Sequence, residues 1–171
     1  MQPVRASITI DRPREEVFEY LADIANHPEF CDHFLKDWRL LRVDSYGTGA
    51  GARYRMDAPL QRFGWADLSF VDVQPPHRIA GVGRGGKFNR VKTYCEWALA
   101  ALGTSTRVEY MAESDPPLPS DRLVEAAGGL RGWYRRKSNK MLRRLQRILE
   151  EDAGAPVRGR RATVAGGAHG P

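Results

Sequence analysis

The sequence lacks any long run of apolar residues. No stretch approaches the roughly 20 residues that a helix needs to cross a bilayer, and residues 1–10 lack the apolar core of a secretory signal peptide. Cysteine is scarce as well, because only Cys31 and Cys95 are present and they form no Cys-x-x-Cys motif. Two buried, reduced thiols are favoured over a disulfide or a metal pair. These absences predict a cytoplasmic protein.

A local catalytic or cofactor-binding motif is also missing. The segment 81–87 is rich in glycine, but no helix follows it, so it predicts a hairpin turn and not a phosphate-binding loop. His27 and His33 lie six residues apart, a spacing that does not readily bring two ligands to one metal ion, and we expect surface or capping roles for both. The sequence therefore indicates neither a metal ion nor a cofactor.

What is present is typical of one soluble globular domain. The chain has 171 residues, of which 42% are hydrophobic and 28% are charged. The net charge of +6 is unevenly distributed. Residues 1–120 carry 15 basic and 16 acidic side chains, whereas residues 121–150 carry nine basic and three acidic ones. The basic character therefore belongs to the C-terminal part of the chain.

The first half of the pattern predicts one strand, two short helices and then an antiparallel meander. Residues 4–10 alternate between apolar and polar, as in a half-buried strand. Pro13 begins a helix, and 29–35 is expected to form a second short one. Period-two segments with turn residues between them follow. These predicted strands are 38–45, 52–58, 65–73, 78–83, 91–99 and 106–113.

Residues 121–150 predict a long amphipathic helix. Apolar or small side chains recur at steps of three and four and share one face; they are Leu123, Ala127, Leu130, Tyr134, Ser138, Met141, Leu145 and Ile148. Gly128, Gly129 and Gly132 interrupt its first half. Either the helix begins after these glycines or they make a thin stretch within it. We expect a single domain over residues 1–152 and a disordered basic tail over 153–171.

Several short motifs resemble those of the START-like (SRPBCC) superfamily, in particular its polyketide cyclase/dehydrase and coenzyme-Q-binding branch. They are the proline-led helix of 10–18, the Leu-Ala-Asp of 21–23, the His-Pro-Glu-Phe of 27–30, the proline pair of 75–79 and the final hairpin from Trp97. The resemblance implies an α+β helix-grip fold. In that fold a curved antiparallel sheet wraps around a long C-terminal helix, and two short helices follow strand 1.

The resemblance also implies a hydrophobic or amphipathic small molecule held in a cavity between sheet and helix. The alternatives are a polyketide cyclase/aromatase-type enzyme acting on a poly-β-keto or aromatic substrate in that cavity, and an accessory protein that delivers a quinone or lipid. Aromatic residues with polar tips suit such a wall as a group, although for each one alone an ordinary core position is favoured. The candidate ligand-binding residues are Tyr54, Phe70, Trp97, Tyr110, Leu130 and Tyr134.

Acidic residues on the predicted strands are the candidates for a general base. Asp67, Asp72 and Glu96 would qualify if they faced inward, but an outward, solvated position is favoured. A bulge near Asp72 would also reverse the face on which Phe70 lies.

The polar face of the long helix is strongly basic. The interpretations are a solvated face, peripheral contact with an anionic membrane, and, least favoured, contact with nucleic acid. The residues concerned are Arg131, Arg135, Arg136, Lys137, Lys140, Arg143, Arg144 and Arg147.

Overall fold

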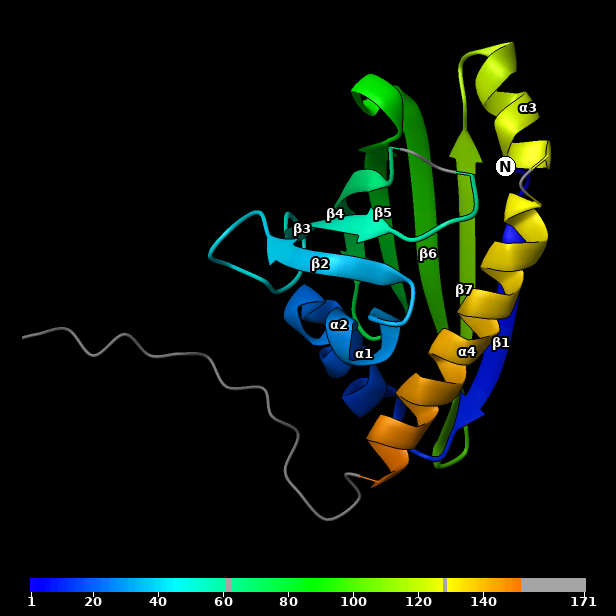
Figure 1. The fold of residues 1–171 in the computed structure, drawn as a ribbon. Coiled ribbons are helices and arrows are strands. Elements are labelled where there is room, and N and C mark those ends of the chain that lie inside the picture. The colour runs from blue at the N-terminus through cyan, green and yellow to red at the C-terminus, as the bar shows by residue number, and fades with distance from the viewer. Residues whose placement is uncertain (61–62, 128, 152–171) are drawn as a thin grey trace, which may run out of the picture.

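The computed structural model describes residues 1–60, 63–127 and 129–151, and its main element is a curved antiparallel sheet of seven strands (Figure 1). The strand order is β1-β7-β6-β5-β4-β3-β2, so β2 to β7 form a meander and β1 pairs with β7. The strands are β1 (Val4–Ile10), β2 (Leu35–Leu40), β3 (Gly51–Met56), β4 (Trp65–Gln74), β5 (Arg78–Gly85), β6 (Val91–Leu102) and β7 (Ser105–Asp115).

The α-helices lie after the first strand and after the last strand. Between β1 and β2 lie α1 (Arg14–Ala22), the 3-10 helix η1 (Ile24–Asn26) and α2 (His27–Cys31). A second 3-10 helix, η2 (Lys87–Asn89), lies in the turn between β5 and β6. After β7 come α3 (Pro119–Ala127) and α4 (Leu130–Glu151). This arrangement confirms the predicted α+β helix-grip fold.

Helix α4 lies across one end of the open sheet and is tied to its neighbours on two sides (Figure 1). Its apolar face buries Met141, Leu142 and Leu145 in the core. On the side of α2, Arg144 donates to Asp32 at 2.5 Å. On the side of β1, Gln146 donates to the carbonyl oxygen of Thr9 at 3.1 Å. The helix is therefore fixed to both β1 and α2.

The prediction of one helix over 121–150 was wrong, because two helices occupy that segment. Gly129 has φ +58, a left-handed conformation that ends α3, and α4 starts at Leu130. Leu123 is 70% exposed and Ala127 is exposed, so the predicted apolar stripe is buried only from Leu130 onward. Gly128 lies outside the described residues, as does the predicted basic tail.

The bounds of the second short helix and of β2 also differ from the prediction. The helix spans His27–Cys31, so Leu35 begins the strand instead of ending the helix. The ladder of β2 shifts register between Lys36 and Arg39. After Leu40 the chain leaves the sheet edge, and the carbonyl oxygen of Ser45 accepts from the Ile24 amide at 2.9 Å. The segment 41–45 thus reaches across to η1 instead of continuing β2.

The curvature of the sheet has two visible causes. A register shift between Phe70 and Asp72 marks the bulge that the sequence raised as an alternative. At Gly83 the strands lie so close that a Cβ atom would be 2.2 Å from the carbonyl oxygen of Asp67. The glycine-rich segment therefore belongs to a strand and its hairpin turn, as expected.

Candidate functional site: an apolar cavity between sheet and helices

A cavity of about 100 Å³ lies between the inner face of the sheet, α2 and α4. Strand alternation selects its wall, because Cys95 and Trp97 point inward while Tyr94 and Glu96 carry their polar ends to the other face. Most of the wall is apolar or aromatic. The wall includes His27, Cys31, Leu35, Trp38, Tyr54, Met56, Leu68, Cys95, Trp97, Tyr110, Ala112, Leu130, Tyr134 and Met141.

The structure brings most of the predicted ligand-binding residues together. The five that line the cavity are Tyr54, Trp97, Tyr110, Leu130 and Tyr134. Phe70 is not among the lining residues. It is 1% exposed, and its ring lies 5.7 Å from the ring of His27, measured between centroids. Phe70 therefore supports the wall from behind.

Two tyrosines from opposite sides of the cavity meet in its interior. The hydroxyl oxygens of Tyr110, on β7, and Tyr134, on α4, are 3.0 Å apart. One hydroxyl donates to the other, so the O–H of the accepting tyrosine is left to donate elsewhere. Burial raises the pKa of both phenols above the ordinary value. Both side chains therefore stay neutral and act as hydrogen-bond donors.

His27 is a buried polar group of the wall. It is 3% exposed, and its Nε2 lies 2.9 Å from the carbonyl oxygen of Leu21. A carbonyl oxygen only accepts, so Nε2 carries the proton and Nδ1 of the neutral ring is an acceptor. Burial lowers the pKa of His27 to about 4, against an opposing effect of the bond to Leu21. The imidazole is therefore neutral at physiological pH.

Trp38, on β2, also lines the cavity and carries a buried donor. Its ring stacks on that of Tyr54 with centroids 5.2 Å apart and planes within 10° of parallel. The buried Nε1–H has no hydrogen-bond partner among the described residues. The ring of His27 lies 5.9 Å away between centroids. An acceptor and a donor therefore lie on adjacent rings.

The two cysteines also line the cavity, and both are free thiols. Burial raises the pKa of Cys31 well above the ordinary value and that of Cys95 to about 12. A nucleophilic or metal-binding cysteine needs the thiolate form. Both thiols therefore act as apolar wall groups.

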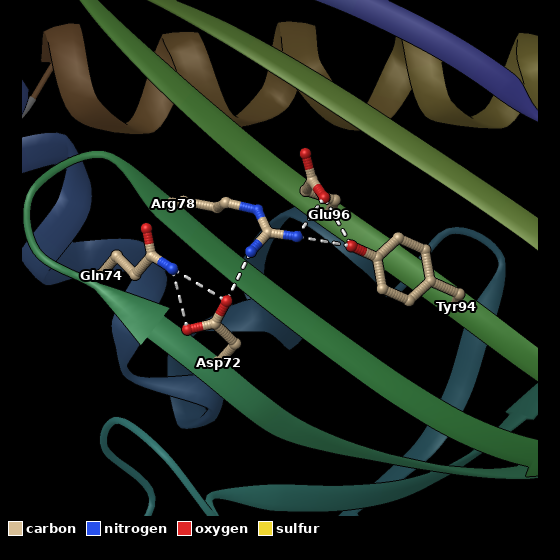
Figure 2. A network of polar contacts seen from close by, with 5 residues as sticks. All are labelled: Asp72, Gln74, Arg78, Tyr94 and Glu96. Carbon is tan, nitrogen blue, oxygen red and sulfur yellow. Dashed lines mark hydrogen bonds and ion pairs between the residues drawn. The ribbon is translucent and has the colours of Figure 1, made fainter.

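The acidic residues on the strands lie on the other face of the sheet. Asp67 accepts from Arg53 at 2.6 Å, and Arg78 bridges Asp72 and Glu96 at 2.5 and 2.8 Å (Figure 2). The arginine partners hold the pKa values of Asp67 and Glu96 below the ordinary value. These carboxylates are charged, paired and turned away from the cavity. The favoured outward position is correct for all three.

The expectation of a surface or capping role for His27 was wrong. His27, Phe30, Cys31 and Phe34 follow at steps of three, one and three, which places them on one face of a helical segment. All four are buried. That spacing was the available signal for an inward histidine. Trp38 lacked such a signal, because its burial depends on the register shift in β2.

Metal binding and membrane spanning find no support in the described part of the chain. No group of three or more His, Cys, Asp or Glu side chains there is placed to hold a metal ion. Among the same residues, no helix is both long and apolar enough to cross a bilayer.

A curved sheet closed by a C-terminal helix over an apolar cavity defines the helix-grip class of protein. The sequence matches the family described as "Polyketide cyclase / dehydrase and lipid transport" over residues 1–150, and the chain belongs to this family. No curated protein sequence matches this chain.

Solved structures with the same fold have distant sequences. The KanY protein is 16% identical, with a TM-score of 0.67 over 86% of this chain and 97% of that one. The protein TTHA0849 from Thermus thermophilus is 13% identical, with a TM-score of 0.66 over 88% and 99%. Norcoclaurine synthase from Thalictrum flavum, solved in complex with dopamine and hydroxybenzaldehyde, is 11% identical, with a TM-score of 0.63 over 88% and 87%. At these identities the likeness shows the fold alone.

Proposed function

We propose that the protein binds a hydrophobic or amphipathic small molecule in the cavity between the sheet and α4. The observation that carries this proposal is the indole N–H of Trp38, which has no partner among the described residues and belongs to a side chain of a mostly apolar and aromatic wall. A buried polar group without a partner costs about 1–3 kcal/mol. A ligand that accepts from this N–H removes that cost while its apolar body contacts the aromatic wall. The family description, which includes lipid transport, supports the same interpretation.

The unfilled volume supports the proposal energetically. No side chain fills about 100 Å³ of space in the cavity, so the atoms of its wall lack packing partners on that side. The glycines and small residues around it do not fill the space, whereas a ligand restores the lost contacts. An ordinary core packed for stability alone would have no such space.

Two cavity variants and one core variant separate ligand binding from stability. We expect Trp97→Ala and Tyr134→Ala to weaken binding of an apolar fluorescent probe at least tenfold, because each removes contact area from the wall. Leu149→Ala is the control, since Leu149 is buried but does not line the cavity. It should lower the melting temperature and leave the affinity of the folded protein unchanged. Unchanged affinity in both cavity variants would show that their side chains belong to the core alone.

Native mass spectrometry of the protein purified from its host tests the proposal without a chosen probe. We expect a co-purifying molecule whose mass identifies it and whose occupancy falls in Trp97→Ala. Protein that shows neither a retained molecule nor binding to apolar probes would contradict the proposal.

A second candidate function is that of a polyketide cyclase/aromatase-type enzyme, and the tyrosine pair favours it. The free O–H of Tyr110 or Tyr134 can donate to a ketone oxygen as an enolate develops on it. The one imidazole in the described wall, His27, is a weak base, because its pKa of about 4 lies far below neutral pH. This mismatch places binding ahead of catalysis. If the wild type and a Tyr110→Phe/Tyr134→Phe variant cyclise a poly-β-keto substrate equally, the proposed catalytic role of the tyrosine pair is rejected.

A further inference from the structure

Two nitrogen atoms on adjacent rings of the cavity wall lack partners in the described part of the chain. Nε2 of His27 is bound to the Leu21 carbonyl, and Nδ1 has no partner among the described residues. The Nε1–H of Trp38 is buried and equally without a partner there. One atom is an acceptor and the other a donor.

The two rings are neighbours in the wall. Their centroids are 5.9 Å apart. One oxygen atom that shares two hydrogen bonds of about 2.9 Å joins nitrogen atoms up to about 5.8 Å apart. A hydroxyl group is the smallest ligand group that donates to one nitrogen and accepts from the other.

The surroundings of the two rings favour a neutral group. Aromatic rings enclose His27, with those of Phe30 and Trp97 at 5.1 and 5.9 Å between centroids. The charged groups along the described wall are Glu113, Glu125 and the Met1 amino group, and Glu125 accepts from that amino group at 2.5 Å. These groups belong to β7, α3 and the start of the chain, not to the elements that hold the two rings. An ionised ligand group beside His27 would lose its hydration, and the described residues of α2 and β2 that line the cavity carry no charge to compensate for that loss.

We propose that His27 and Trp38 together bind one neutral hydroxyl group, so the ligand is a phenol, enol or alcohol with an apolar body. Nδ1 of His27 accepts from the hydroxyl, and Nε1–H of Trp38 donates to its oxygen. The proposal rests on the proposed function of the cavity and adds the class of ligand. It also gives His27 a specificity-determining role that the weak basicity of a buried imidazole permits.

Three naphthalene probes test the two hydrogen bonds separately. 2-Naphthol can donate and accept, 2-methoxynaphthalene can only accept, and naphthalene can do neither. By isothermal titration calorimetry, we expect the wild-type protein to bind 2-naphthol about tenfold more tightly than 2-methoxynaphthalene. Naphthalene should bind most weakly.

Two variants assign these preferences to residues. His27→Phe keeps an aromatic ring but removes the acceptor Nδ1 together with the N–H, so the preference for 2-naphthol over its methyl ether should fall to about onefold. Trp38→Phe keeps a ring to stack on Tyr54 but removes the N–H. It should reduce the advantage of 2-naphthol over naphthalene and preserve the preference over the methyl ether. His33→Phe, outside the cavity, is the matched histidine control and should change neither ratio.

The outcomes distinguish this proposal from the one on which it rests. Equal binding of all three probes to the wild type overturns the hydroxyl site and leaves an apolar cavity. Binding of none overturns both proposals. A hydroxyl preference that survives His27→Phe and is lost in Tyr134→Phe assigns the hydroxyl to the tyrosine pair and overturns the site proposed here. If His27→Phe fails to fold, the wild-type series and Trp38→Phe still decide the matter.

Discussion

At the scale of single residues, His27 lines the cavity and also makes the stability of the fold depend on pH. Its imidazole is buried among aromatic rings and bound through Nε2 to the end of α1. Protonation would place a positive charge in this apolar surrounding, which is why the pKa falls from 6.5 to about 4. In the unfolded chain the same group protonates near its ordinary pKa.

The difference between these two pKa values predicts acid sensitivity. Between about pH 6.5 and pH 4 the unfolded state binds a proton at His27 that the folded state does not, so stability falls as pH falls. Across that window the loss amounts to about 3 kcal/mol. Urea unfolding of the wild type and of His27→Gln at pH 7 and pH 4.5 measures it. Because the variant lacks the titrating group, its stability should depend less on pH; equal slopes would remove His27 as the cause.

His33 is the comparison at this scale. Partial burial lowers its pKa as well, and its Nε2 lies 3.3 Å from the carbonyl oxygen of Lys137. His33→Gln should change the pH slope less, because that side chain remains partly exposed. The inward position of His27 could have been predicted from its spacing to Phe30 and Phe34. The tyrosine pair could not, since it joins β7 to α4 through tertiary packing alone.

At the scale of elements, the sheet was more predictable than the helices. Period-two alternation and turn residues located all seven strands, because each strand has one buried face. The ends of β2 were missed because they depend on a register shift and on the contact of Ser45 with η1. The break between α3 and α4 remained one of two alternatives at the glycines, because the periodic side chains continue across Gly129, although the helical backbone does not.

Two glycines near that break should respond to alanine in opposite directions. At Gly129 the added Cβ would meet no atom within 4 Å, but φ is +58, so Gly129→Ala should destabilise the fold by about 1 kcal/mol. Gly132 lies within α4, and its nearest neighbour would be Nη1 of Arg136 at 3.9 Å. Gly132→Ala should therefore stabilise by about 0.5–1 kcal/mol.

Chemical denaturation of both variants measures these changes. The pair is matched in chemistry and lies three residues apart, so effects common to glycine replacement cancel. Stabilisation by both substitutions would mean that α3 and α4 join into one helix in solution.

At the scale of the whole molecule, the basic residues of α4 lie apart from the cavity, because none of them lines it. The polar face of α4 carries Arg131, Arg135, Arg136, Lys140, Arg143 and Arg147 in exposed positions. Arg144 forms an ion pair with Asp32, and Nζ of Lys137 lies 5.5 Å from the ring centroid of Trp133. Most of the predicted basic face is therefore exposed and could contact a partner. Peripheral contact with an anionic membrane stays a proposal, as does the solvated face.

Vesicle co-sedimentation distinguishes these two interpretations. Near an anionic surface each Lys or Arg contributes about 1 kcal/mol. The triple variant Arg136→Gln, Lys140→Gln, Arg143→Gln should therefore reduce binding to phosphatidylserine-containing vesicles about a hundredfold. Raising the salt should weaken wild-type binding, because the Debye length falls to about 3 Å at 1 M.

The control for this last experiment removes the same charge elsewhere. Arg39, Arg42 and Arg84 are exposed residues of the sheet and its loops, far from α4 in sequence. Replacing all three with glutamine lowers the net charge equally, so any effect of overall charge appears in both triple variants. A loss confined to the α4 variant assigns membrane contact to the basic face, because only that variant changes the local charge density. If the wild type sediments equally with neutral and anionic vesicles, or with neither, the basic face is a solvated face. Its charges then keep one side of α4 in water, while Met141 and Leu145 pack the other side against the core.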